Sequence, residues 1–335
     1  MTGLKTSGLN TFSNLFHGFS EILKDIPAAG IDSVAALLPG KRTLAFTPKG
    51  YLKGVKEGFN KGLRYLKTGF DERDVATKLD HRRVNFGTSK FAKGIQAYTD
   101  TVFRVLGSED QPFYYGAKAR SLESQAIAQA KNQGLKGAEA KSFIDNVIEN
   151  PTDEMLKYAV MDAETAVFQN RTVLGDIAKA VQRAPGGEVI VPFGRTPSAV
   201  ATQVLNYTPI GAVKTIVQNI GRGRFDQRAF SQGLARGLAG TGVMFVGFEL
   251  LNNGLMTLGR PTTEREQKLW ELEGRSANSI KIGDKWRSVQ VLGPAGNVLL
   301  IGGYFADAMK REGSPTKAMA EAVAFLRSEL FGNPV

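Results

Sequence analysis

One kind of helix-starting signal recurs along the chain and constrains its fold more than any other feature. At four places a helix-capping residue stands directly before a proline: Asn150-Pro151, Thr196-Pro197, Thr208-Pro209 and Ser314-Pro315. Asn, Ser and Thr side chains accept hydrogen bonds from the first amides of a helix, and the fixed φ of proline suits the first helical position. Each pair therefore predicts a helix start, and the first helix is expected to run to about residue 183.

Apolar residues at helical spacing predict further helices over 8–24, 51–70, 112–134 and 137–149. A β-hairpin is expected where 279–282 and 285–291 flank the turn pair Gly283-Asp284, and a weaker extended piece at 188–192. We therefore predict an all-α fold, an elongated multi-helix assembly with one small β-hairpin near 279–291. Three regions are expected: a basic helical region over 1–99, a helical middle over 100–190, and a C-terminal helical region over 191–335.

Positive charge is concentrated in one short stretch. The chain has a formal charge of +11, and residues 41–70 hold eight basic residues against one acid, Glu57. The helix expected there places Leu52, Val55, Phe59, Leu63, Leu66 and Phe70 on one face, with the basic residues largely elsewhere: Lys53, Lys56, Lys61, Arg64 and Lys67. This pattern fits either a solvated helix face or contact with an anionic surface, DNA or lipid. Gly54, Gly58 and Gly62 add a smooth strip that a helix or a membrane can approach closely.

A smaller basic turn lies further along the chain, at Arg222 and Arg224 with Arg228 nearby. We predict that these three residues also contact an anionic surface, against the alternative of a solvated connection between helices.

Two long stretches are almost free of charge. Between Arg236 and Arg260 the only charged residue is Glu249, and no charge occurs between Arg287 and Asp307. Their lengths suit either two buried core helices or membrane insertion under particular conditions, which makes 237–258 and 288–306 candidate spans. The residues expected to contact a membrane or another subunit are Val243, Phe245, Phe248, Leu299, Leu300 and Phe305.

Catalytic chemistry is sparsely represented. The chain has no cysteine and two histidines, His17 and His81, which excludes disulfide frameworks, thiolate metal sites and cysteine nucleophiles. The glycine-rich run at 237–242 lacks the preceding strand and the following Lys of a phosphate-binding loop. We therefore predict a protein that is not an enzyme, with no catalytic residue, no metal and no cofactor.

Several short motifs beyond residue 100 resemble a known class of protein. They are DTVFRVL at 100–106, PFYY at 112–115, NPTDEM at 150–155, VPFGRTP at 191–197, WRS at 286–288 and LGP at 292–294. Together they resemble a helical region of large multidomain proteins of tailed phages, including the internal virion proteins of short-tailed phages. Many relatives carry a peptidoglycan-cleaving module, which is not recognisable in this sequence.

The resemblance implies an ejection protein that is stored in the virion and assembles into a conduit for the genome across the host envelope. The expected partners are further copies of the chain, other virion, ejection or portal proteins, phage DNA bound without sequence preference, and the host inner membrane. The expected locations are the virion and, after infection, the host periplasm and inner membrane. The alternative is a structural protein inside the capsid or at the portal, which contacts packaged DNA and is not ejected.

Overall fold

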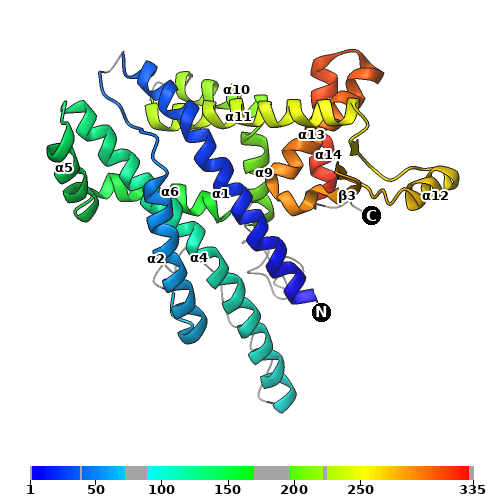
Figure 1. Ribbon diagram of the computed structural model, residues 1–335, viewed down its shortest axis with the longest axis horizontal. Helices are drawn as coiled ribbons and strands as arrows, with labels where there is room; N and C mark the ends of the chain where they lie inside the picture. The colour runs from blue at the N-terminus through cyan, green and yellow to red at the C-terminus, as the bar shows by residue number, and fades with distance from the viewer. Residues whose placement is uncertain (1, 38–39, 72–88, 170–195, 222–224, 332–335) are drawn as a thin grey trace. The chain divides into compact units, whose positions relative to one another are not determined.

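The computed structural model describes residues 2–37, 40–71, 89–169, 196–221 and 225–331. The described residues confirm the predicted fold class, because they form α-helices with one small antiparallel sheet (Figure 1). The chain divides into two compact units: unit 1 comprises residues 1–18 and 36–170, and unit 2 comprises 19–35 and 171–335. Helix α1 (Thr2–Ala35) contributes its first half to unit 1 and its second half to unit 2.

Unit 1 is built around a long helix, α4 (Lys90–Asn132), with α2 (Lys49–Thr68), α5 (Gly137–Glu149) and α6 (Asp153–Ala166). Helix α2 packs along α4 through its glycine strip, because a Cβ at Gly54, Gly58 or Gly62 would lie within 2.6 Å of a backbone carbonyl oxygen of α4. A neighbouring helix, rather than a membrane, therefore occupies the smooth strip. Aromatic residues of α4 around Tyr114 pack against the end of α6 to form a core.

Two sequence predictions in unit 1 are wrong in detail. The helix expected from residue 112 starts at Lys90 and continues through Pro112. The helix expected from Pro151 starts at Asp153, because Thr152 and not Asn150 caps it: the Thr152 hydroxyl accepts a hydrogen bond from the Met155 amide at 3.3 Å. This helix ends at Ala166, and the extended piece expected at 188–192 lies outside the described residues.

Among the described residues, unit 2 contains the second half of α1 and six further α-helices: α9 (Thr196–Asn206), α10 (Pro209–Ile220), α11 (Gln227–Asn252), α12 (Glu264–Leu272), α13 (Pro294–Glu312) and α14 (Pro315–Phe331). The starts predicted at Thr196-Pro197, Thr208-Pro209 and Ser314-Pro315 are confirmed. Helices α11 and α13 approach closely, since the Cβ that Gly247 lacks would fall within 2.9 Å of the Leu299 backbone.

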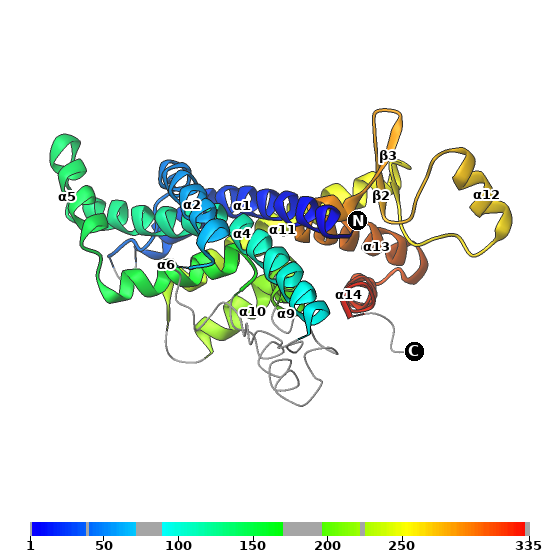
Figure 2. The ribbon, with the colours of Figure 1, turned by 90° about the horizontal axis from the view of Figure 1, so that it is seen from below.

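The predicted hairpin is confirmed and belongs to a three-stranded antiparallel sheet in the order β1-β2-β3. Strand β2 (Ser279–Ile282) pairs with β3 (Lys285–Ser288), and Gly283 turns the chain with a φ of +60° (Figure 2). Residues 289–292 form a 3-10 helix rather than more strand. The two-residue strand β1 (Met256–Thr257) was not predicted. Of the expected region boundaries, the one near residue 100 falls inside α4 and the one near 190 lies outside the described residues.

Candidate membrane and assembly surfaces

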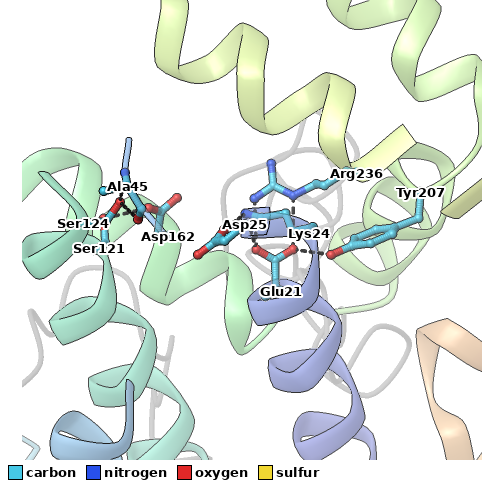
Figure 3. Close-up of polar contacts among 9 residues, drawn as sticks. All are labelled: Glu21, Lys24, Asp25, Ala45, Ser121, Ser124, Asp162, Tyr207 and Arg236. Atoms are coloured by element: carbon cyan, nitrogen blue, oxygen red, sulfur yellow. Dashed lines mark hydrogen bonds and ion pairs between the residues drawn. The ribbon is translucent and has the colours of Figure 1, made fainter. Parts of the chain in front are cut away.

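The second half of α1 turns its charged residues toward the inside of unit 2 (Figure 3). Glu21 Oε1 accepts hydrogen bonds from the Tyr207 hydroxyl at 2.7 Å and from Arg236 Nε at 3.1 Å. Glu21 Oε2 accepts from Arg236 Nη2 at 3.2 Å and lies 2.7 Å from Lys24 Nζ. The side chains of Glu21 and Lys24 are 2% and 0% exposed. A buried carboxylate with two cations and a hydroxyl around it is well satisfied, which offsets the cost of removing these charges from water.

A second polar contact joins the same two helices about three turns further along α1. The Gln227 side-chain amide donates to Asp32 Oδ1 at 2.9 Å and to the Asp32 carbonyl at 3.2 Å, and Asp32 is fully buried. Because Glu21 meets Arg236 while Asp32 meets Gln227, the two helices run antiparallel. Polar contacts therefore hold α1 to α11.

The opposite face of α1 is apolar and exposed. Glu21, Lys24, Ala28 and Asp32 are buried, whereas the large apolar residues at complementary positions are exposed: Phe19, Leu23, Ile26 and Val34. At about 100° per residue these two sets lie on opposite sides of the helix. A helix on the surface of a water-soluble protein normally has the reverse arrangement, with its apolar stripe facing the core. The second half of α1 is thus inverted in polarity.

Helices α10 and α11 add more exposed apolar residues to unit 2. Helix α10 has Lys214 as its only charged residue, and it exposes Ile210, Val213, Ile216, Val217 and Ile220. Helix α11 exposes Leu238, Phe245 and Val246, with Phe245 62% exposed. We call these residues of α10 and α11, together with the exposed apolar face of α1, the apolar exterior of unit 2. An apolar surface built from several helices is typical of contact with lipid or with another protein.

Within the described part of the chain, α11 is the one helix whose length and composition suit a membrane span. Its 26 residues extend about 39 Å, more than the hydrocarbon core of about 30 Å. Only 28% of its most apolar 18-residue stretch is buried, so α11 is not simply a core helix. The span predicted at 237–258 is wrong at its C-terminal end, because the helix stops at Asn252 and Met256 enters the sheet.

The second predicted span, 288–306, is a core element instead. Residues 289–292 form the 3-10 helix, and α13 begins only at Pro294. Leu299 and Leu300 are 7% and 2% exposed, and they pack in a cluster with Met256 and Val289. Phe305 is partly buried, with its ring centroid 6.3 Å from that of Phe248. Among the residues predicted for membrane or assembly contact, only Phe245 is fully on the surface, while Val243 and Phe248 are half-buried.

Helix α2 in unit 1 has three faces rather than two. The glycine strip, with Tyr51 and Tyr65, is buried against α4. The predicted apolar face is exposed, with Leu52 69% and Phe59 59% exposed. The predicted basic residues Lys53, Lys56, Arg64 and Lys67 are exposed as well. Since glycine occupies the buried strip, the apolar and basic faces both remain on the outside.

The fifth predicted basic residue of α2, Lys61, is partly buried. Its ammonium lies 3.2 Å from Glu57 Oε1 and 4.3 Å from the centroid of the Tyr115 ring. Lys118 of α4 lies near Lys61. The pKa of Lys118 is lowered mainly by burial and to a smaller extent by the positive charge of Lys61. In unit 2, Arg228 is 4% exposed and so does not face an anionic surface, contrary to the prediction. Arg222 and Arg224 lie outside the described residues.

No catalytic arrangement is visible among the residues that the structure describes. Nowhere in them do three or more His, Asp or Glu side chains gather into a potential metal site. His17 is buried, with its ring centroid 4.5 Å from that of Phe168, and His81 lies outside the described residues. The residues that sequence reasoning missed are the buried polar residues of α1. Glu21, Lys24 and Asp32 lie on one helix face together with Ala28, and this spacing was the available signal.

No protein-family model, curated protein or solved structure matches this chain.

Proposed function

We propose that this chain is a non-enzymatic virion protein of a tailed phage that is ejected and oligomerises into a conduit for the genome across the host envelope. The resemblance of residues 100–335 to phage ejection proteins motivates the proposal. The structural observation that carries it is the inverted polarity of the second half of α1 in unit 2. There α1 buries Glu21 and Lys24 and, with α10 and α11, presents an apolar exterior.

Because its apolar residues face outward, the apolar exterior of unit 2 is expected to be covered by lipid or by another protein when the protein acts. In water, each exposed Val, Leu, Ile or Phe side chain forgoes roughly 1.5–3 kcal/mol that full burial contributes. Lipid or a further copy of the chain supplies that burial. Charges inside such an assembly must be paired internally, since an unpaired charge in a bilayer is costly. The contacts of Glu21 with Lys24 and Arg236 supply that pairing.

The partners proposed for such a conduit are further copies of this chain, other virion or portal proteins, phage DNA and the host inner membrane. Its proposed locations are the virion and then the host periplasm and inner membrane. The decisive experiment compares virions before and after DNA release. We expect intact virions to contain many copies and emptied particles to have lost them. Retention of the full complement would instead favour a structural protein that stays in the capsid against packaged DNA.

Surface variants test the role of the apolar exterior. We expect Phe245→Asp and Val217→Asp to fold normally, because both side chains are at least 62% exposed. Both should reduce vesicle insertion, measured by flotation after a high-salt wash that releases protein bound only to the vesicle surface. Both should also reduce self-association, measured by light scattering after gel filtration. Leu272→Asp is the matched control, because Leu272 of α12 is 85% exposed and lies outside this exterior. If Phe245→Asp and Val217→Asp insert and assemble as well as the control, the exterior is not used.

A further inference from the structure

Helix α2 buries a single face, which is formed by glycines and two tyrosines. The residues directed at α4 are glycines at every fourth position, with Tyr51 and Tyr65 at the edges. Val55 and Lys61 flank this face and are half-buried, and most of the other side chains of α2 are exposed. This leaves an outer surface that the packing of unit 1 does not use.

The outer surface of α2 is divided lengthwise into two strips. Placed at about 100° per residue, the apolar residues Leu52, Phe59, Leu63 and Leu66 fall in one sector of about 60°. The exposed basic residues fall in the adjacent sector of about 80°: Lys53, Lys56, Arg64 and Lys67. We call these the apolar strip and the basic strip. Phe70, just beyond the C-terminal end of the helix, is 61% exposed and adds a second exposed aromatic ring.

Three lysines of the basic strip carry charge that the described residues of unit 1 do not neutralise. Helix α2 holds six basic residues and one acid, and that acid, Glu57, pairs with Lys61 outside the strip. Within the described residues, no ion pair involves Lys53, Lys56 or Lys67. Three ammonium groups along one side of one helix produce a positive potential that favours a densely charged anionic surface.

The two strips together select one kind of occupant. Both strips can contact an anionic bilayer. Apolar side chains enter the boundary between headgroups and acyl chains, and lysines contact the phosphates. Duplex DNA offers phosphates to the basic strip, yet it leaves Phe59 and Leu63 in water. A neutral bilayer uses only the apolar strip. We propose that the outer surface of α2 binds the surface of membranes rich in anionic lipid, with the helix axis parallel to the bilayer.

This inference stands apart from the proposed conduit, because it concerns unit 1 and requires neither ejection nor insertion of α11. The test measures binding of the full chain to vesicles of phosphatidylglycerol and phosphatidylcholine, with pure phosphatidylcholine vesicles beside them. We expect strong binding to the anionic vesicles that weakens steeply with salt, and at least tenfold weaker binding to the neutral ones.

Two variants separate lipid from DNA as the occupant. A charge variant, Lys53→Gln/Lys56→Gln/Lys67→Gln, should weaken vesicle binding roughly 100-fold, at about fivefold for each charge removed. An apolar variant, Phe59→Ser/Leu63→Ser, should weaken vesicle binding at least tenfold and leave any binding of duplex DNA unchanged. Circular dichroism should show both variants folded, because all five positions lie on the surface of α2.

A matched control removes the same charge elsewhere. Lys268→Gln/Lys281→Gln/Lys285→Gln changes three exposed lysines of unit 2, and we expect it to alter vesicle binding less than threefold. The proposal is overturned if anionic and neutral vesicles bind equally, or if the control weakens binding as much as the charge variant. It is also overturned if the apolar variant binds anionic vesicles like the unmodified chain, since α2 is then a phosphate-binding face suited to DNA. Phe245→Asp, which tests unit 2, should leave this surface binding intact, so the two proposals fail separately.

Discussion

Gly58→Ala is expected to destabilise unit 1, although alanine is the better helix former. Gly58 lies near the middle of α2, directly over α4. A Cβ at this position would lie 2.7 Å from the Pro112 Cα and 2.8 Å from the Gln111 carbonyl carbon. Both atoms belong to the backbone of α4, so no rotation of a side chain can relieve the overlap. The two helices must move apart instead.

The magnitude follows from two opposing terms. Carbon atoms pack favourably at about 3.5–4.0 Å, so the helices must separate locally by roughly 1 Å. Overpacking of this kind costs about 1–3 kcal/mol. Replacing a helical glycine by alanine contributes about 1 kcal/mol in the other direction. Because the clash is with backbone, we expect the overpacking cost near its upper limit and a net loss of about 1–2 kcal/mol. For a unit of this size, that lowers Tm by roughly 2–8 °C.

The assay is thermal and urea unfolding followed by circular dichroism, with Gly94→Ala as the matched control. Gly94 is also helical and lies on α4, but it is exposed and a Cβ there meets nothing within 4 Å. We expect Gly94→Ala to stabilise the protein by about 0.5–1 kcal/mol, the ordinary helix-propensity gain. If Gly58→Ala also stabilises the protein, α4 does not lie on the glycine strip and the packing of unit 1 described above is wrong.

Three further predictions concern buried and half-buried charges. Glu21→Ala leaves two cations without their carboxylate inside unit 2 and should cost about 3–5 kcal/mol in urea unfolding, whereas Asp25→Ala, at the edge of the same cluster, should cost far less. Lys118→Met should raise Tm at pH 7, because burial and a neighbouring lysine lower the pKa of Lys118 in the folded chain. The gain in Tm should shrink as the pH rises toward 10.5, where the unfolded chain also loses this proton. A gain in Tm that does not change with pH would contradict the reasoning. Leu300→Asp buries a charge in the core and should unfold unit 2, as measured by circular dichroism, whereas Phe245→Asp should leave it folded. Equal unfolding by the two variants would contradict the difference in burial between Leu300 and Phe245.

Helix α2 shows how far sequence reasoning reaches. Its helical spacing, its basic residues and its glycine strip were all predicted from the residue types. The pattern did not reveal which of the three faces is buried, because an apolar stripe is normally the buried one. Packing decides otherwise here: α4 occupies the glycine strip, and Phe59 and Leu52 remain exposed.

Unit 2 shows a limit of a different kind. The apolar spacing of α1 predicted a helix, and the capping pairs predicted the starts of α9, α10 and α14. The inverted polarity of α1 was not predicted, because the partners of Glu21 lie far away in the sequence. Tyr207 and Arg236 are 186 and 215 residues distant, so only the fold brings them to the carboxylate.

Interactions between residues close in the sequence determined one part of this structure, and packing between distant segments decided the rest. Helix type, three of the four capping starts and the hairpin turn at Gly283 depend on interactions within a few residues, and the sequence alone determined them. The errors at Pro112 and Asn150 occur where distant packing or a competing cap, Thr152, outweighs a local preference. Burial depends on which surfaces meet after the chain has folded. For this reason tertiary structure alone decided that Leu300 is core, that Phe245 is exterior, and that the charges of α1 face inward.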